Sequence, residues 1–494
     1  MSGLLPANTW TADQSLQSLL RRWLPASTYA AAEPALSEMG RASASELQEW
    51  GDACERQPAT LRPFDGWGDR VDEVVYPDAW RKIAGAAARA GLVGLPYEGH
   101  SQVAFGPDVR MVQAALCYLF APSTATYLCP VAMTDGAARV LLDAGDRTLG
   151  ETAMHLVSRD PTTAWTSGQW MTERQGGSDV GRNAVVARRD NGRWRLYGQK
   201  FFCSNIGCEI ALALARPEGA SEGTRGLALF LVPRDRADGS RNGYRIDRLK
   251  DKLGTRAMAT GEVTLEGAEA DLIGAVDRGF SQMTAMLNIT RLHNAITAAA
   301  LIRRAWMLAS AYAAQREAFG RRLDQHPLHR EVLNGIGREA DGALALTMRM
   351  AQLLGRIECG SASEQDASLF RVGIALAKLY TAKQAVTNVS EAIECFGGQG
   401  YVEDTGLPRL LRDAQVLPIW EGTTNVLSLD ALRVLGRPPA VEAIASELSR
   451  LNAPEREAAI DMARKAASSD DQAAARRVAY ALARSWMDGL TAAA

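Results

Sequence analysis

Cysteine is sparse in this sequence of 494 residues, and none of it is arranged for metal binding. Seven cysteines are scattered along the chain, and no two of them form a Cys-x-x-Cys pair. An odd and scattered set excludes a disulfide framework and a zinc site of the usual spacing. His326 and His329 are three residues apart, but Pro327 separates them and no third ligand is evident, so we expect no metal site. The sequence therefore predicts free thiols in a reducing compartment such as the cytoplasm.

An excess of charge of either sign is also absent. The chain has 55 Lys and Arg residues against 57 Asp and Glu residues, which gives a net charge of −2 and a pI near 6.3. This balance gives no global attraction to nucleic acid or to an anionic membrane, although a local patch can exist within a balanced total. Binding of nucleic acid is thus possible but is not supported by the charge.

Long hydrophobic runs are missing, with one exception. Residues 111–134 carry no charge over 24 positions, which is long enough to cross a bilayer. Two prolines and several polar side chains interrupt the run, so we expect buried helices with a break at Pro122 and no membrane span. The N-terminus does not have the pattern of a signal peptide, because its first basic pair, Arg21 and Arg22, comes too late.

The secondary-structure signals change along the chain in the order helix, strand, helix. Residues 1–165 are alanine-rich and predict a mainly helical domain, whereas 166–280 contain short apolar runs and turns that predict a compact β domain. Within the latter, Asn191-Gly192 predicts a tight hairpin turn. Four helical candidates follow within 281–436, at about 281–318, 328–356, 366–396 and from Thr423, and predict an antiparallel bundle. Residues 437–494 predict a helical appendix.

One carboxylate stands out as a candidate catalytic base. Glu421 follows the uncharged run 416–420 and precedes Gly422, which allows a backbone turn. A carboxylate beside Ile419 and Trp420 is expected to lose water on folding, which shifts its pKa and suits it to proton transfer. The alternative is a solvated glutamate in a loop between helices.

Two segments of the β domain are candidates for ligand binding. The stretch 171–180, MTERQGGSDV, can bring backbone N–H groups and the hydroxyls of Thr172 and Ser178 close to carbonyl or phosphate groups, or it is simply a turn. The stretch 198–205, GQKFFCSN, places aromatic rings beside a hydroxyl. It is suited to packing a planar cofactor, or it belongs to the β core.

Two segments of the helical region are candidates as well. Arg316, in REAFG, is expected to end a long helix, where it pairs with a pyrophosphate or caps the helix. The break at 397–400, GGQG, allows a ligand to approach the backbone, but it also ends a helix. It is not a Gly-x-Gly-x-x-Gly fingerprint, so no Rossmann domain is predicted.

Taken together and in order, these motifs resemble the acyl-CoA dehydrogenase family. The segments MTERQGGSDV, GQKFFCSN, REAFG, FGGQGY and LLRDAQVLPIWEGTTN carry the resemblance, which runs from about Gln169 to Gly436. Upstream, residues 69–80 and 129–134, together with the spelling of MTERQGGSDV, look more like the alkylation-response or AidB-type branch. The resemblance implies an α+β fold with an N-terminal helical domain, a middle β-barrel and a C-terminal four-helix bundle, assembled as a homotetramer or homodimer.

The resemblance also implies FAD as the cofactor and assigns site residues. The positions that match FAD contacts of the family are Met171, Thr172, Ser178, Phe202, Ser204, Arg316, Phe319, Glu394, Gly398, Thr423 and Asn425. Phe202 stands where the family usually has tryptophan, and Ser204 where it has threonine. Substrate contacts are expected from Ser178, Asn288 and Arg291, although Asn288 replaces a commonly acidic residue.

Glu421 matches the catalytic glutamate of the family. The implied reaction is α,β-dehydrogenation of an acyl-CoA, in which Glu421 removes the α-proton, a hydride passes to flavin N5, and an electron-transfer flavoprotein accepts the electrons. Two alternatives stay open: an AidB-type flavoprotein that binds DNA or protects against alkylating agents, and a related flavin oxidase or monooxygenase.

Overall fold

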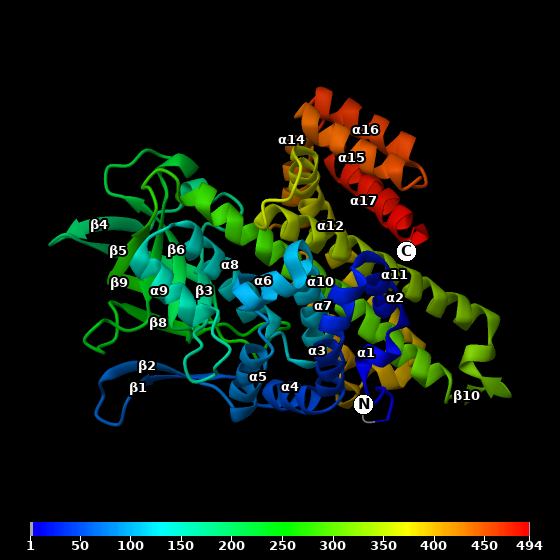
Figure 1. The fold of residues 1–494 in the computed structure, drawn as a ribbon. Helices are drawn as coiled ribbons and strands as arrows, with labels where there is room; N and C mark the ends of the chain where they lie inside the picture. The colour runs from blue at the N-terminus through cyan, green and yellow to red at the C-terminus, as the bar shows by residue number, and fades with distance from the viewer. Residues whose placement is uncertain (1–2, 494) are drawn as a thin grey trace. The chain divides into compact units, whose positions relative to one another are not determined.

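Two structural units share the chain in a computed structural model that describes residues 3–493 (Figure 1). The helical unit comprises the chain up to Glu49, Pro96–Thr124 and everything from Arg291 onward. The barrel unit comprises Trp50–Leu95 and Ala125–Thr290. The boundary between Thr290 and Arg291 falls inside one long helix, α10 (Gly279–Ala313).

A closed ring of strands forms the core of the barrel unit. The seven strands are β3 (Ser167–Trp170), β4 (Val186–Asp190), β5 (Arg193–Ser204), β6 (Ile210–Pro217), β7 (Ala228–Pro233), β8 (Tyr244–Leu249) and β9 (Thr260–Ile273). Pairing runs from β6 through β4, β5, β9 and β7 and back to β6, with β3 parallel to β6 and β8 antiparallel to β9. The middle β-barrel implied by the resemblance is thus confirmed.

Apolar side chains fill this barrel. Leu196, Phe230 and Val263 are fully buried in its core, and Trp170 is 1% exposed. The predicted hairpin is confirmed as β4 and β5, which pair Asp190 with Arg193 across the two-residue turn. Asn191 and Gly192 adopt φ values of 49° and 84°, the left-handed conformation that a tight hairpin turn requires.

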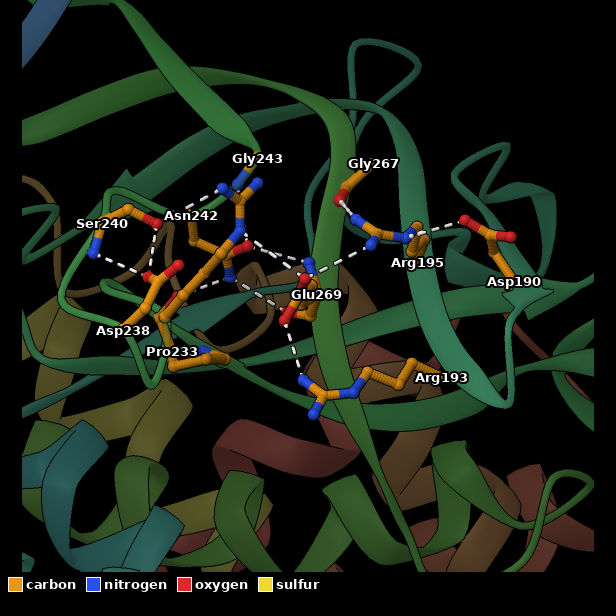
Figure 2. Close-up of polar contacts among 11 residues, drawn as sticks. Asp190, Arg193, Arg195, Pro233, Asp238, Ser240, Asn242, Gly243, Gly267 and Glu269 are labelled. Atoms are coloured by element: carbon orange, nitrogen blue, oxygen red, sulfur yellow. Dashed lines mark hydrogen bonds and ion pairs between the residues drawn. The ribbon is translucent and has the colours of Figure 1, made fainter.

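A polar network ties the barrel strands to the loop before β8 (Figure 2). The carboxylate of Glu269, on β9, accepts hydrogen bonds from Arg193 at 3.2 Å and Arg195 at 3.3 Å, both on β5. The buried Asn242 side chain donates to the carbonyls of Pro233 and Glu269 at 2.8 and 2.9 Å, and it accepts from the Glu269 N–H at 2.8 Å. The ends of β7 and β9 are therefore held at a fixed register beside the loop.

The remaining elements of the barrel unit include a hairpin that the sequence did not predict. It consists of β1 (Thr60–Phe64) and β2 (Arg70–Val75), and it lies within a region expected to be helical. Asp72 accepts a hydrogen bond from the Ile246 N–H at 2.9 Å, and Arg70 donates to the Ile246 carbonyl at 2.8 Å, so the hairpin is fixed to β8. The helices of this unit are α5 (Asp78–Arg89), α8 (Leu128–Asp143) and α9 (Arg147–Leu156).

The helical unit is built around long helices that pack along their lengths. They are α10, α11 (Pro327–Glu358), α12 (Glu364–Cys395) and α14 (Thr424–Leu435), with the short α13 (Leu407–Ala414) preceding α14. Its earlier helices are α1 (Thr9–Ala12), α2 (Gln14–Trp23), α3 (Ala26–Ala44), α6 (Gly99–Phe105) and α7 (Val109–Phe120), and α4 (Glu46–Arg56) crosses the boundary between the units. Ser363 begins α12 with a capping box, in which its hydroxyl accepts from the Asp366 N–H at 3.0 Å.

The uncharged run at 111–134 forms buried helices, as predicted. Every residue of α7 is buried, a short 3₁₀ turn at Ala121–Ser123 contains Pro122, and α8 begins at Leu128. Among the described residues, no helix has both the length and the apolarity needed to cross a membrane.

Residues after Gly436 add three helices to the helical unit, drawn in orange to red in Figure 1. They are α15 (Pro438–Arg450), α16 (Arg456–Ser468) and α17 (Ala475–Ala492). Trp486 of α17 is fully buried, and a Cβ placed on Gly373 of α12 would lie 2.8 Å from its ring. The glycine therefore leaves the space in which the indole ring packs.

Candidate functional site

The loop that carries Glu421 has an unusual backbone. It lies between α13 and α14, and Glu421 and Gly422 adopt φ values of 56° and 105°. Gly422 adopts such an angle without strain, whereas a residue with a β-carbon does so at a cost of about 1–2 kcal/mol. The predicted turn is present, but it includes Glu421 itself. Such a conformation persists only where the surrounding structure holds it.

Two cations from two different helices hold this loop. The Nε atom of Arg291, on α10, donates to the carbonyl oxygen of Glu421 at 3.3 Å. The Nζ atom of Lys378, on α12, donates to the carbonyl oxygen of Gly422 at 2.7 Å. Lys378 is fully buried, and the side chain of Arg291 is 11% exposed. One residue earlier, the indole N–H of Trp420 donates to the side-chain oxygen of Asn294 on α10.

A carboxylate on α14 completes the charged group. Asp430 lies 3.4 Å from Arg291, 2.9 Å from Arg371 and 2.6 Å from Arg433. Burial alone would raise the pKa of Asp430, but the hydrogen bonds from Arg371 and Arg433 outweigh burial and lower that pKa to about 2. Asp430 therefore stays ionised and offsets part of the positive charge near Glu421.

The two cations that face the loop have altered acidity. Burial lowers the pKa of Arg291, although the charges of Asp430 and Glu421 oppose this effect. Burial likewise lowers the pKa of Lys378 to about 7; the Glu421 charge raises this pKa and the Arg291 charge lowers it further. Lys378 was not predicted from the sequence as a site residue. The sequence does distinguish it, because Lys378 is the only charged residue in the stretch 372–382.

The neighbours of Glu421 behave differently from the expectation. Ile419 is 61% exposed within the helical unit, so its side chain does not shield the Glu421 carboxylate from water there. Thr423 is the N-cap of α14, and its hydroxyl accepts from the Val426 N–H at 3.4 Å. Asn425 is exposed. Asn288 lies three residues before Arg291 on α10, and its buried side-chain oxygen has no hydrogen-bond partner among the described residues.

A cavity of about 490 Å³ in the helical unit brings together three of the predicted residues. Arg316, Glu394 and Gly398 line it, together with Tyr312 and His329. A Cβ placed on Gly398 would meet nothing within 4 Å, so a ligand can reach the backbone there. A guanidinium beside an open glycine backbone is suited to binding a phosphate group.

The segment REAFG does not end a helix, and this expectation is corrected. The helix α10 ends at Ala313, and residues 317–322 form a small hairpin of β10 (Glu317–Ala318) and β11 (Arg321–Arg322). Phe319 and Gly320 make its turn with φ values of 52° and 77°, a conformation that excludes a helix. Phe319 is 97% exposed and does not line the cavity that Arg316 lines.

In the barrel unit, the predicted residues come from β5 and from the loop between β3 and β4. Met171 and Thr172 follow β3, and the Thr172 carbonyl accepts from the Phe201 N–H at 2.9 Å. This bond brings the two motifs side by side. Phe202 is 50% exposed, and the Ser204 hydroxyl lies 3.4 Å from that of Thr260. Ser178 is exposed in the loop.

A buried ion pair fixes the base of that loop. The Nζ atom of Lys200 lies 2.8 Å from Glu173, and both side chains are almost fully buried. Glu173 also accepts hydrogen bonds from the backbone N–H groups of Ala184 at 2.6 Å and Val185 at 3.2 Å. Burial would raise the pKa of Glu173, but the charge and hydrogen bond of Lys200, together with the hydrogen bond from the Ala184 N–H, lower it. The ionised Glu173 therefore anchors both ends of the loop that carries Ser178.

Taken separately, the two units present groups that fit the two parts of a flavin nucleotide. The barrel unit offers the exposed ring of Phe202 and the hydroxyls of Thr172 and Ser204, which suit a planar polar ring system. The helical unit offers Arg316 and an open glycine backbone, which suit a diphosphate.

Three family models match consecutive parts of the chain. Residues 3–160 match the adaptive response protein AidB N-terminal domain, residues 168–268 the acyl-CoA dehydrogenase middle domain, and residues 277–436 the acyl-CoA dehydrogenase C-terminal domain. The AidB-type character inferred from the upstream segments is thus confirmed for the N-terminal region.

Individual proteins give the same result. The chain is 44% identical to acyl-CoA dehydrogenase family member 11 of Caenorhabditis elegans over 86% of its own length and 70% of the relative's. It is 35% identical to the putative acyl-CoA dehydrogenase AidB of Escherichia coli K12 over 83% and 74% of the two lengths. The crystal structure of C. elegans ACDH-11 in complex with C11-CoA superimposes with a TM-score of 0.93 at 40% identity, covering 98% of this chain and 87% of that one.

Proposed function

Because the chain belongs to the acyl-CoA dehydrogenase family, we propose that it is a FAD-dependent enzyme that introduces an α,β double bond into an acyl-CoA. The observation that carries the proposal is the left-handed backbone conformation of Glu421. Arg291 donates a hydrogen bond to the carbonyl of residue 421, and Lys378 donates one to the carbonyl of residue 422. These hydrogen bonds fix the backbone from which the Glu421 carboxylate extends before the substrate arrives, as positioning of a general base requires.

The chemistry requires removal of a proton from the carbon next to the thioester carbonyl. A carboxylate oxygen of Glu421 accepts this proton. When bound, FAD supplies the acceptor for the hydride that leaves the β-carbon.

The residues expected to hold FAD lie in both units. In the barrel unit they are Met171, Thr172, Ser178, Phe202 and Ser204, and in the helical unit they are Arg316, Glu394, Gly398, Thr423 and Asn425, with Phe319 exposed for contact with a second copy of the chain. The buried side-chain oxygen of Asn288 has no hydrogen-bond partner in the part of the chain that the structure describes, which suits Asn288, with Ser178 and Arg291, to contact the substrate. We further expect a homotetramer or homodimer in the cytoplasm, with an electron-transfer flavoprotein as electron acceptor.

The test is anaerobic mixing of FAD-loaded protein with acyl-CoAs of graded chain length, followed by the flavin absorbance. We expect one class of thioester to bleach the wild-type flavin and the Glu421→Gln variant to stay oxidised. Glu442→Gln is the matched control, because Glu442 is exposed on α15 and the substitution is chemically the same. If acyl-CoA still fully reduces the flavin of the Glu421→Gln variant, Glu421 is not the base. Failure of every acyl-CoA to reduce yellow, folded protein would end the dehydrogenase proposal.

A second candidate is the protective or DNA-binding role of an AidB-type flavoprotein, which the N-terminal family match favours. Against it, residues 437–494 hold eight basic and eight acidic residues, so these helices lack the excess positive charge that binding to phosphates requires. Salt-dependent retention of duplex DNA by the FAD-loaded protein tests this role. A flavin oxidase or monooxygenase would instead consume oxygen when the same mixture is prepared in air.

A further inference from the structure

Lys378 is the feature of the helical unit whose role the proposed reaction does not yet explain. It is a fully buried lysine on a helix whose neighbouring residues are apolar, and burial of an ammonium group without compensation is strongly unfavourable. Its Nζ atom donates to the carbonyl of Gly422, which directly follows Glu421. A neutral donor would serve this bond equally well, so the choice of a charged group calls for an electrostatic reason.

The charges around Lys378 give that reason. The acidic group that acts on it is Glu421, which favours the protonated lysine, and Arg291 on α10 opposes it. Asp430 on α14 also faces Arg291, but it is already shared with Arg371 and Arg433. Arg291 is therefore paired with Asp430 as well as being close to Glu421, whereas the acidic group that acts on Lys378 is Glu421.

We propose that Lys378 is a positioning residue for Glu421, which fixes the direction of the Glu421 loop through its hydrogen bond to the Gly422 carbonyl and is coupled by charge to the Glu421 carboxylate. This inference rests on the proposed function only where it concerns the reaction rate.

The hydrogen bond and the charge can be separated by two substitutions. Lys378→Met keeps the length of the side chain but removes the donor and the charge. Lys378→Gln keeps a donor but removes the charge. Lys383→Met, one and a half turns further along α12, is the matched control, because Lys383 is partly exposed and donates to neither carbonyl.

The first measurement is the maximal rate of anaerobic flavin reduction, together with the acyl-CoA concentration that gives half of that rate. We expect Lys378→Met to lower the maximal rate by about tenfold or more and to leave the half-saturating concentration within about twofold, because the loop that carries Glu421 loses its hydrogen bond at Gly422. Lys378→Gln should recover part of the rate, since it keeps a donor for that bond. Equal maximal rates in Lys378→Met, Lys378→Gln and Lys383→Met would overturn the proposal.

The second measurement does not depend on activity. The chain has seven lysines, so labelling lysine with ¹³C at Cε gives few NMR resonances, and Lys378→Met identifies the one from Lys378. We expect this resonance to titrate near neutral pH in the wild type and at a lower pH in Glu421→Gln. An unchanged titration in Glu421→Gln would overturn the proposal. If no acyl-CoA reduces the wild type but the titration shifts, the proposed reaction fails while the coupling of Lys378 to Glu421 stands.

Discussion

Arg349 and Glu447 form a buried ion pair that joins α11 to α15. The Nε atom of Arg349 lies 2.9 Å from a carboxylate oxygen of Glu447, and the two residues are 8% and 5% exposed. Arg450, one turn after Glu447, reaches the same carboxylate at 3.1 Å. The three C-terminal helices are thus attached to the bundle by a desolvated charge pair as well as by the buried indole of Trp486.

Removal of the carboxylate should loosen this attachment. We expect Glu447→Ala to lower the free energy of unfolding by about 3–5 kcal/mol, because it leaves the Arg349 guanidinium buried without its partner. Glu442→Ala is the control, since its pair with Arg464 is exposed and should contribute about 0–1 kcal/mol. Urea unfolding of both variants measures the difference. Equal losses would mean that the buried pair contributes no more than an exposed one.

The ion pair of Lys200 and Glu173 should stabilise the loop that carries Ser178. We expect Lys200→Met to lower stability by about 3–5 kcal/mol, since Glu173 would remain buried and unpaired. Hydrogen exchange of the Ala184 and Val185 amides, which donate to Glu173, should accelerate at the same time. The double variant Lys200→Met/Glu173→Met should recover most of the stability, because no unpaired charge remains. Similar losses in the single and double variants would contradict this explanation.

Asp430 should make stability depend on pH in the acidic range. Its pKa in the folded protein is about 2, below the ordinary aspartate value, so it stabilises the fold at a pH above about 4 and this contribution is lost as the pH falls toward 2. We expect the stability difference between wild type and Asp430→Asn to be constant above about pH 5, at roughly 2–3 kcal/mol, and to shrink below about pH 4. Asp470→Asn, which makes the same substitution at an exposed position, is the matched control. A difference that is independent of pH down to 2 would exclude a titrating Asp430.

Local signals predicted much of the fold. The Asn191-Gly192 turn was predictable because two adjacent residues determine it. The hairpin of β1 and β2 was missed, because its alternate residues are only partly buried and its attachment to Ile246 is remote in sequence. The C-terminal end of α10 was predicted beyond its observed position, because the alanine-rich sequence favours helix up to the turn at Phe319.

The candidate site was predictable to the extent that it is local. Glu421 and the glycine after it are adjacent, so their sequence indicated a turn with a carboxylate. The groups that hold the turn come from α10 and α12, and spacing along the chain does not bring Arg291 and Lys378 to the same loop. The resemblance supplied Arg291 but not Lys378. The role of Glu421 as the base and the FAD contacts stay predictions.

The closed ring of the barrel has a consequence for how the protein is made. The strand β9 pairs with β5, β7 and β8, and its pairing with β5 joins Trp194 to Ala270. The ring therefore cannot close until synthesis has passed Ile273, and until then the nascent β5 and β7 have unpaired edges that can associate with other chains. Such long-range pairing is slow compared with helix formation. Low temperature during expression weakens hydrophobic association between chains and should therefore raise the yield of correctly folded protein, and barrel closure should be the slow step in refolding.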